Sequence, residues 1–129
     1  MYAELLRSES SLTRKLTYFD IGGRAEAIRA LLAHAGFMYE DNRITFEHAA
    51  ELKHSGYAPM GNFPLWEEDG LVTCQSNTIL RMLGIKLGYY SDNPDVAYKI
   101  DSLCDFAEDL QPKFDAYVLP FLNDGSFGD

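Results

Sequence analysis

Gln75 and Ser76 stand where an apolar run ends and a helical pattern begins. The start of a helix offers free backbone N–H groups and the positive end of the helix dipole, which together bind carboxylates. The amide of Gln75 and the hydroxyl of Ser76 can add hydrogen bonds to such an anion. Capping of the helix by Ser76 would explain the same pair without any ligand, so both interpretations stand at this point.

A second candidate is Pro64, which opens an apolar run that Asp69-Gly70 joins to another at 71–74. Asp-Gly between two such runs predicts a β-hairpin. The proline is either tolerated at the first position of an edge strand, where its missing N–H is not needed, or it follows a cis bond. In the cis case, the neighbouring backbone N–H and C=O would face outward and pair with an extended ligand.

Tyr18 and Arg24 flank a turn that contains two glycines, Gly22 and Gly23. A tyrosine at the end of a strand usually packs into the core, although its hydroxyl also makes it a candidate hydrogen-bond donor. Arg24 begins a helix, where the dipole disfavours a cation. A nearby acid or a bound anion would offset this unfavourable placement.

The elements that must position these residues follow from the hydrophobic periodicity. The sequence predicts strands at 15–20 and 38–45, helices at 24–36 and 46–56, the hairpin at 64–74, a helix at 76–87 and a long helix that begins at Pro94. Asn93 is predicted to cap the long helix. Pro112 should bend this helix or end it early. The order β-α-β-α-β-β-α predicts a mixed sheet with helices on both faces, followed by the long helix.

Composition narrows the classes of function. The chain has 129 residues, 47% of them hydrophobic, and a net charge of −9, which argues against nucleic acid and anionic membranes as partners. Two distant cysteines fit a reducing compartment such as the cytosol, and the three histidines show no metal-ligand spacing. A thiol–disulfide oxidoreductase would need a cysteine near Tyr18, and the segment YFDIGG has none.

Two segments carry a family resemblance. KLTYFDIGGRAEAIRALLAHAG, from Lys15, resembles the opening strand and helix of the glutathione S-transferases, and FPLWEEDGLVTCQSNTILRMLGIKLGYY, from Phe63, resembles a later segment of the pi and sigma classes. The resemblance extends to about Phe121. It implies an α/β, thioredoxin-like fold with a mixed four-stranded sheet flanked by helices, followed by the start of an all-helical domain. The expected divisions are a tail at 1–14, a glutathione-binding domain at 15–90 and the first helix of a truncated all-α domain at 91–129.

The resemblance also implies roles for individual residues. Tyr18 would be the catalytic tyrosine that activates the glutathione thiol for transfer to an electrophilic apolar substrate, a detoxification reaction. The residues implied to bind glutathione are Tyr18, Arg24, Lys53, Asn62, Phe63, Pro64, Gln75, Ser76 and Asp109. In this scheme Pro64 is cis, the backbone of Phe63 pairs with the cysteinyl part, and Gln75 with Ser76 holds the γ-glutamyl carboxylate. Lys53 pairs with the glycine carboxylate, and Asp109 reaches the neighbouring subunit's γ-glutamyl amine. The implied protein is a cytoplasmic homodimer with glutathione as co-substrate and no metal.

The chain departs from the family pattern in four ways, of which Glu47 and the missing further helices support an alternative. One of the other two is Asn62, which stands where the family carries a glutamine before the proline pair. Glu47, with Ala49 as the other candidate, stands where pi-like members carry a tryptophan near the glycine end of glutathione. The aromatic side chain expected at the dimer contact is replaced by Met60 or Tyr57. The family continues with several more helices beyond the one that begins at Pro94. The alternative is therefore a non-catalytic or truncated transferase-like module for dimerisation or protein binding.

Overall fold

The computed structural model describes residues 13–123, which divide between Tyr90 and Ser91 into two compact units. Most of the predicted tail, residues 1–12, therefore lies outside the described residues. Arg14, the last residue of that predicted tail, begins the first strand and is buried. The two units are described separately below.

The first unit is built on a four-stranded sheet with strand order β2-β1-β3-β4. Its strands are β1 (Arg14–Phe19), β2 (Glu40–Ile44), β3 (Leu65–Glu68) and β4 (Leu71–Cys74). β1 pairs parallel with β2 and antiparallel with β3, and β3 pairs antiparallel with β4. The sheet is therefore mixed, as predicted from the element order.

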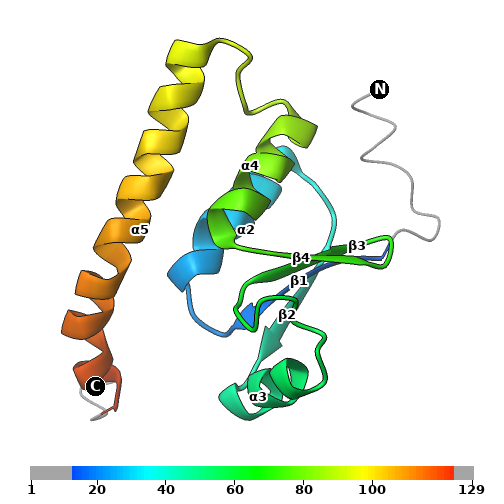
Figure 1. Ribbon diagram of the computed structural model, residues 1–129, viewed down its shortest axis with the longest axis vertical. Helices are drawn as coiled ribbons and strands as arrows, with labels where there is room; N and C mark the ends of the chain where they lie inside the picture. The colour runs from blue at the N-terminus through cyan, green and yellow to red at the C-terminus, as the bar shows by residue number, and fades with distance from the viewer. Residues whose placement is uncertain (1–12, 124–129) are drawn as a thin grey trace. The chain divides into compact units, whose positions relative to one another are not determined.

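Helices flank this sheet on both sides (Figure 1), with α2 and α4 on one side and α3 on the other. A short 3₁₀ helix, η1 (Gly23–Ala25), leads into α2 (Glu26–Ala35), α3 is Phe46–His54 and α4 is Ser76–Leu87. The apolar stripes of α2 and α4 pack together over β1 and β3. The core formed there contains Leu16, Tyr18, Ile28, Leu32, Trp66, Ile79 and Leu83. This arrangement confirms the thioredoxin-like fold.

The start of α4 differs from one expectation. Gln75 occupies the N-cap position with φ 76° and ψ 108°, and it makes no side-chain capping hydrogen bond. Ser76 is the first residue of the helix, so the prediction that Ser76 is the N-cap is wrong by one position. The reason is that β4 ends at Cys74, which leaves a single residue to turn the chain from strand into helix.

The second unit consists of α5 (Pro94–Asn123). Its start is as predicted, because Pro94 is the first helical residue and Asn93 Oδ1 accepts a hydrogen bond from the Asp95 N–H at 2.9 Å. Pro112 is expected to bend the helix or to end it early, and because it lies inside the helix, the expectation of early termination is wrong. A proline removes one N–H donor, and the turns beyond it can resume their own hydrogen bonds. No helix between residues 13 and 123 is both long and apolar enough to cross a membrane.

Candidate functional site

Tyr18 lies near the end of β1, with 7% of its surface exposed. Its hydroxyl oxygen accepts a hydrogen bond from the backbone N–H of Arg24 at 3.2 Å. The chain turns sharply between these residues, and Gly23 in that turn has φ +48°. A Cβ atom at Gly23 would lie 2.8 Å from the Tyr18 hydroxyl oxygen. The predicted freedom of the glycine turn is therefore used at Gly23, which leaves room for the phenol.

A pocket of about 240 Å³ lies beside this turn, lined by Arg24, Asn62, Phe63, Gln75 and Ser76. All five were predicted from the sequence as ligand-binding residues, and they come from three separate parts of the chain. The Phe63–Pro64 bond is cis, which decides between the two interpretations of Pro64. The fold therefore brings together the turn after β1, the segment before β3 and the start of α4.

The start of α4 borders this pocket. The first backbone N–H groups of an α-helix point out of its N-terminus, and the helix dipole adds partial positive charge there. Arg24 lines the same pocket and adds a full positive charge. The Gln75 side-chain amide donates to the sulfur of Met60 at 3.4 Å. This side chain therefore points toward the loop that precedes Pro64. A carboxylate fits this combination of groups.

Aromatic rings surround the loop that carries Phe63. The Phe19 ring centroid lies 4.6 Å from that of Phe46 and 5.9 Å from that of Phe63. Lys53, at the end of α3, places its Nζ atom 5.9 Å from the Phe63 ring centroid. Lys53 therefore lies next to Phe63, although it is not among the residues that line the pocket.

Three other predicted site residues are placed differently. Tyr18 is not in the lining of the pocket, but it is bonded to Arg24, which is. Pro64 is fully buried beneath the loop. Asp109 belongs to α5 in the second unit, and its role toward a neighbouring subunit stays a prediction. Glu47 is exposed in the first turn of α3.

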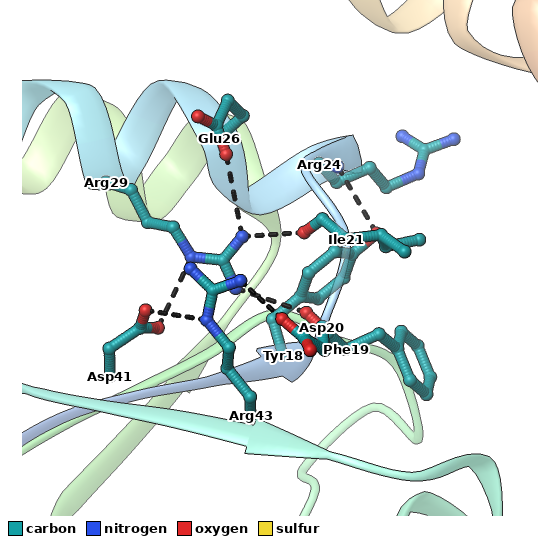
Figure 2. A network of polar contacts seen from close by, with 9 residues as sticks. All are labelled: Tyr18, Phe19, Asp20, Ile21, Arg24, Glu26, Arg29, Asp41 and Arg43. Carbon is teal, nitrogen blue, oxygen red and sulfur yellow. Dashed lines mark hydrogen bonds and ion pairs between the residues drawn. The ribbon is translucent and has the colours of Figure 1, made fainter. Parts of the chain in front are cut away.

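The sequence analysis missed Arg29, which lies at the centre of a polar network behind Tyr18 (Figure 2). Arg29 is 8% exposed and contacts backbone carbonyl groups of the turn as well as two acids. A signal was present in the sequence, because Arg29 falls on the apolar stripe between Ala25 and Leu32 at helical spacing. A charged residue on such a stripe must be paired when it is buried.

The described residues contain no candidate metal centre. Between residues 13 and 123, no group of three or more His, Cys, Asp or Glu side chains is arranged to hold a metal ion. Cys74 is buried and Cys104 half-buried, and neither forms a disulfide bond. The pocket and the turn beside it contain a phenol, an arginine, side-chain amide groups and a helix start.

Comparison with known proteins identifies the family. Residues 14–84 match the family model of the glutathione S-transferase N-terminal domain. The chain is 40% identical over 104 residues to glutathione S-transferase 1 of Ascaris suum, covering 78% of this chain and 50% of that protein. It is 35% identical over 99 residues to human glutathione S-transferase P, covering 77% of this chain and 47% of that protein.

A solved structure gives the same result. The crystal structure of a major nematode-specific glutathione S-transferase of Caenorhabditis elegans matches with a TM-score of 0.72 and 32% identity, covering 92% of this chain and 57% of that one. The chain thus spans about half the length of the curated relatives it matches. Because the family model covers more than half of this chain and includes every pocket-lining residue, the chain belongs to the glutathione S-transferase family.

Proposed function

We propose that this protein binds glutathione in the pocket beside Tyr18 and joins glutathione, through its thiol sulfur, to an electrophilic apolar substrate. The observation that carries the proposal is the composition of the pocket, whose lining is Arg24, Asn62, Phe63, Gln75 and Ser76. These are five of the residues for which the family resemblance implies contacts with glutathione. They meet around a helix start, which supports binding of a carboxylate.

The proposed binding mode runs across the pocket from α4 to α3. The γ-glutamyl carboxylate accepts hydrogen bonds at the start of α4 from Gln75 and Ser76. The cysteinyl part pairs with the backbone of Phe63, beside Asn62 and Pro64. The glycine carboxylate extends toward Lys53, whose position next to Phe63 supports this direction. In a homodimer, Asp109 of the second subunit would meet the γ-glutamyl amine.

The proposed chemical step is activation of the thiol by Tyr18. A free cysteine thiol has a pKa of about 8.5, and the thiolate is the nucleophile. Lowering that pKa by about two units requires about 2.7 kcal/mol of thiolate stabilisation. One hydrogen bond to a charged group contributes about 1.5–3 kcal/mol, so a hydrogen bond from the Tyr18 hydroxyl would account for most of this stabilisation.

The geometry of Tyr18 supports this role. Its hydroxyl has one proton to donate and two lone pairs. The Arg24 N–H uses one lone pair, which leaves the proton for the sulfur. The thiol proton passes to solvent, and the thiolate then forms a carbon–sulfur bond with the electrophile. A leaving group such as halide departs with its bonding electrons, or, where an activated double bond is attacked, the π bond breaks and the resulting carbanion takes a proton from solvent. No metal takes part in this scheme.

The setting we propose for this reaction is a cytoplasmic homodimer in which residues 15–90 bind glutathione. Residues 91–129 would contribute the first helix of the all-helical domain that, in the family, helps to hold the electrophile. Neither nucleic acid nor a membrane is a partner in this proposal. The acidic net charge of −9 supports this choice of partners.

The test is a titration of glutathione into the protein, repeated at several pH values. The ultraviolet absorbance of the thiolate is measured at each pH. We expect a bound thiolate that persists well below pH 8, whereas free glutathione is mostly protonated there. S-methylglutathione, which has no ionisable thiol, is the control and should bind without the thiolate band. Absence of binding at millimolar glutathione would contradict the proposal and favour the non-catalytic module.

A further inference from the structure

Arg29 ties the turn that follows Tyr18 to helix α2. Its Nη1 atom donates to the carbonyl oxygen of Ile21 at 2.6 Å, and its Nη2 atom donates to that of Phe19 at 3.2 Å. These two carbonyl groups flank Asp20, so one guanidinium spans the first part of the turn. Figure 2 shows the side chain of Arg29 reaching across from α2 to both carbonyl groups.

The guanidinium is held from its other side by carboxylates. Its Nε atom donates to Asp41 Oδ1 at 3.3 Å, and Nη1 lies 3.6 Å from Glu26 Oε2. A buried arginine needs such partners, because an unpaired charge inside a protein is strongly unfavourable. Because all three of its nitrogen atoms contact carboxylate or carbonyl oxygens, the planar guanidinium has little freedom to rotate.

Arg43 belongs to the same network, but among the described residues its side chain pairs only with carboxylate groups. It pairs with Asp41 at 2.9 Å and with Asp20 at 2.5 Å, and its side chain is 43% exposed. Its hydrogen bonds with these two acids raise the pKa of Arg43, so it stays charged. Its side chain reaches the turn through the carboxylate of Asp20, whereas Arg29 binds backbone carbonyl groups of the turn, so Arg43 serves as a control for Arg29.

The turn held by Arg29 sets the surroundings of the Tyr18 hydroxyl. The backbone runs from Phe19 through Gly23 to Arg24, whose N–H donates to the Tyr18 hydroxyl oxygen at 3.2 Å. The Arg29 Cζ atom also lies over the Tyr18 ring, 5.9 Å from its centroid, so the guanidinium that binds the turn also faces the phenol ring. A shift of the turn would move the Arg24 N–H and free the hydroxyl to reorient.

We propose that Arg29 is a positioning residue for Tyr18, which holds the turn from Phe19 to Arg24 so that the phenol proton points to the glutathione sulfur. This inference rests on the proposed function. Arg29 does not touch glutathione in this scheme and acts through the backbone of the turn. Its loss should therefore weaken thiol activation more than it weakens glutathione binding.

The experiment compares three variants of the whole chain. Arg29→Lys keeps the positive charge beside Asp41 and Glu26 but cannot span two carbonyl groups, because an ammonium lacks the planar fork of a guanidinium. Arg29→Met removes the charge as well. Arg43→Met is the matched control, since it breaks two ion pairs of the same network without touching the turn backbone.

Two measurements separate positioning from a merely structural role. The first is the apparent pKa of the bound glutathione thiol, which should rise by about one unit in Arg29→Lys and stay unchanged in Arg43→Met. Affinity for S-methylglutathione should change less than about threefold in both variants, a difference of well under 1 kcal/mol. The second is hydrogen exchange of the Arg24 amide without ligand, which should accelerate in Arg29→Lys while amides of α4 keep their rates.

A double-mutant cycle with Tyr18→Phe shows whether Arg29 acts through Tyr18. In the Tyr18→Phe background, Arg29→Lys should produce no further change in the thiol pKa. Equal effects with and without the hydroxyl would overturn the inference, and so would an unshifted thiol pKa in a folded Arg29→Lys variant. If Arg29→Met does not fold, Arg29→Lys decides the question alone.

Failure of the proposed function is distinguishable from failure of this inference. Absence of a bound thiolate in the unaltered chain would refute the proposed function and the inference that rests on it. A thiolate that is present in the unaltered chain and identical in the Arg29 variants would refute the inference only.

Discussion

The backbone N–H of Arg24 donates a hydrogen bond to the hydroxyl oxygen of Tyr18 at 3.2 Å, across a turn that is closed by Gly23. This contact joins the end of β1 to the first residues after the turn. Arg24 also lines the pocket that we propose for glutathione. The phenol is therefore connected to the pocket through one backbone hydrogen bond, and the predictions below begin from this relationship.

Tyr18→Phe should keep glutathione binding and lose most turnover. The ring stays in the core, but no hydroxyl remains to stabilise the thiolate, a loss of about 1.5–3 kcal/mol or roughly 10- to 100-fold in rate. The measurement is kcat/KM with a chromogenic aromatic halide, together with the affinity for S-methylglutathione. Tyr39→Phe, which removes a half-buried hydroxyl outside the pocket lining, is the control. Unchanged turnover in Tyr18→Phe would exclude the proposed role.

Gly23→Ala should impair thiol activation, because the added Cβ atom would lie 2.8 Å from the Tyr18 hydroxyl oxygen. Gly36→Ala is the matched control, since Gly36 also has positive φ but its Cβ atom would have nothing within 4 Å. Both changes should cost about 1 kcal/mol of unfolding free energy through the backbone alone. Only Gly23→Ala should also raise the apparent pKa of the bound thiol. Equal thiolate titrations in the two variants would contradict this prediction.

Ser76→Ala should weaken glutathione binding about tenfold, because one hydrogen bond to a charged carboxylate is lost. Thr78→Ala is the control, since Thr78 is exposed on the same helix and two residues away, where it faces another direction. Calorimetric titration of both variants with S-methylglutathione measures the difference. The assignment of the carboxylate to the start of α4 fails if both variants bind equally well.

Glu68 should make stability depend on pH in the acidic range. Burial alone would raise the pKa of Glu68, but hydrogen bonds and charge from Lys86, with further bonds from Trp66 and Arg14, outweigh it and bring the pKa below its usual 4.5. Arg14 Nε lies 3.2 Å from the Glu68 carboxylate, and Lys86 pairs with the same oxygen.

The sign follows from linkage between proton binding and folding. A lowered folded-state pKa means that the unfolded chain binds the proton more tightly, so stability is present above pH 4.5 and is lost as pH falls through the folded-state pKa. Glu68→Gln should therefore lower the unfolding free energy at pH 7. The decline of the unfolding free energy below pH 4.5 should also be less steep in this variant. Urea unfolding at several pH values measures this, with the exposed Glu40→Gln as control. A parallel decline in Glu68→Gln and the unaltered chain would refute the assignment.

The sequence by itself determined the order of elements and most of the candidate pocket. Hydrophobic period and turn residues are local properties, which is why the sequence predicted the hairpin across Asp69-Gly70 and the helix that begins at Ser76. The pocket residues were predicted by the same local patterns together with the family resemblance. Their meeting in one pocket is a consequence of the fold that those patterns encode.

Only the tertiary structure decided what depends on contacts between distant segments. The cis bond before Pro64 is one case, because both isomers fit the local sequence. The N-cap is another, because the end of β4 at Cys74 determines whether Gln75 or Ser76 turns the chain. The largest case is Arg29, whose partners lie on β1, on β2 and in the turn between β1 and α2. The amphipathic pattern shows that a buried Arg29 needs partners. Only the packing of α2 against the sheet decides that these partners include the two carbonyl groups next to Asp20.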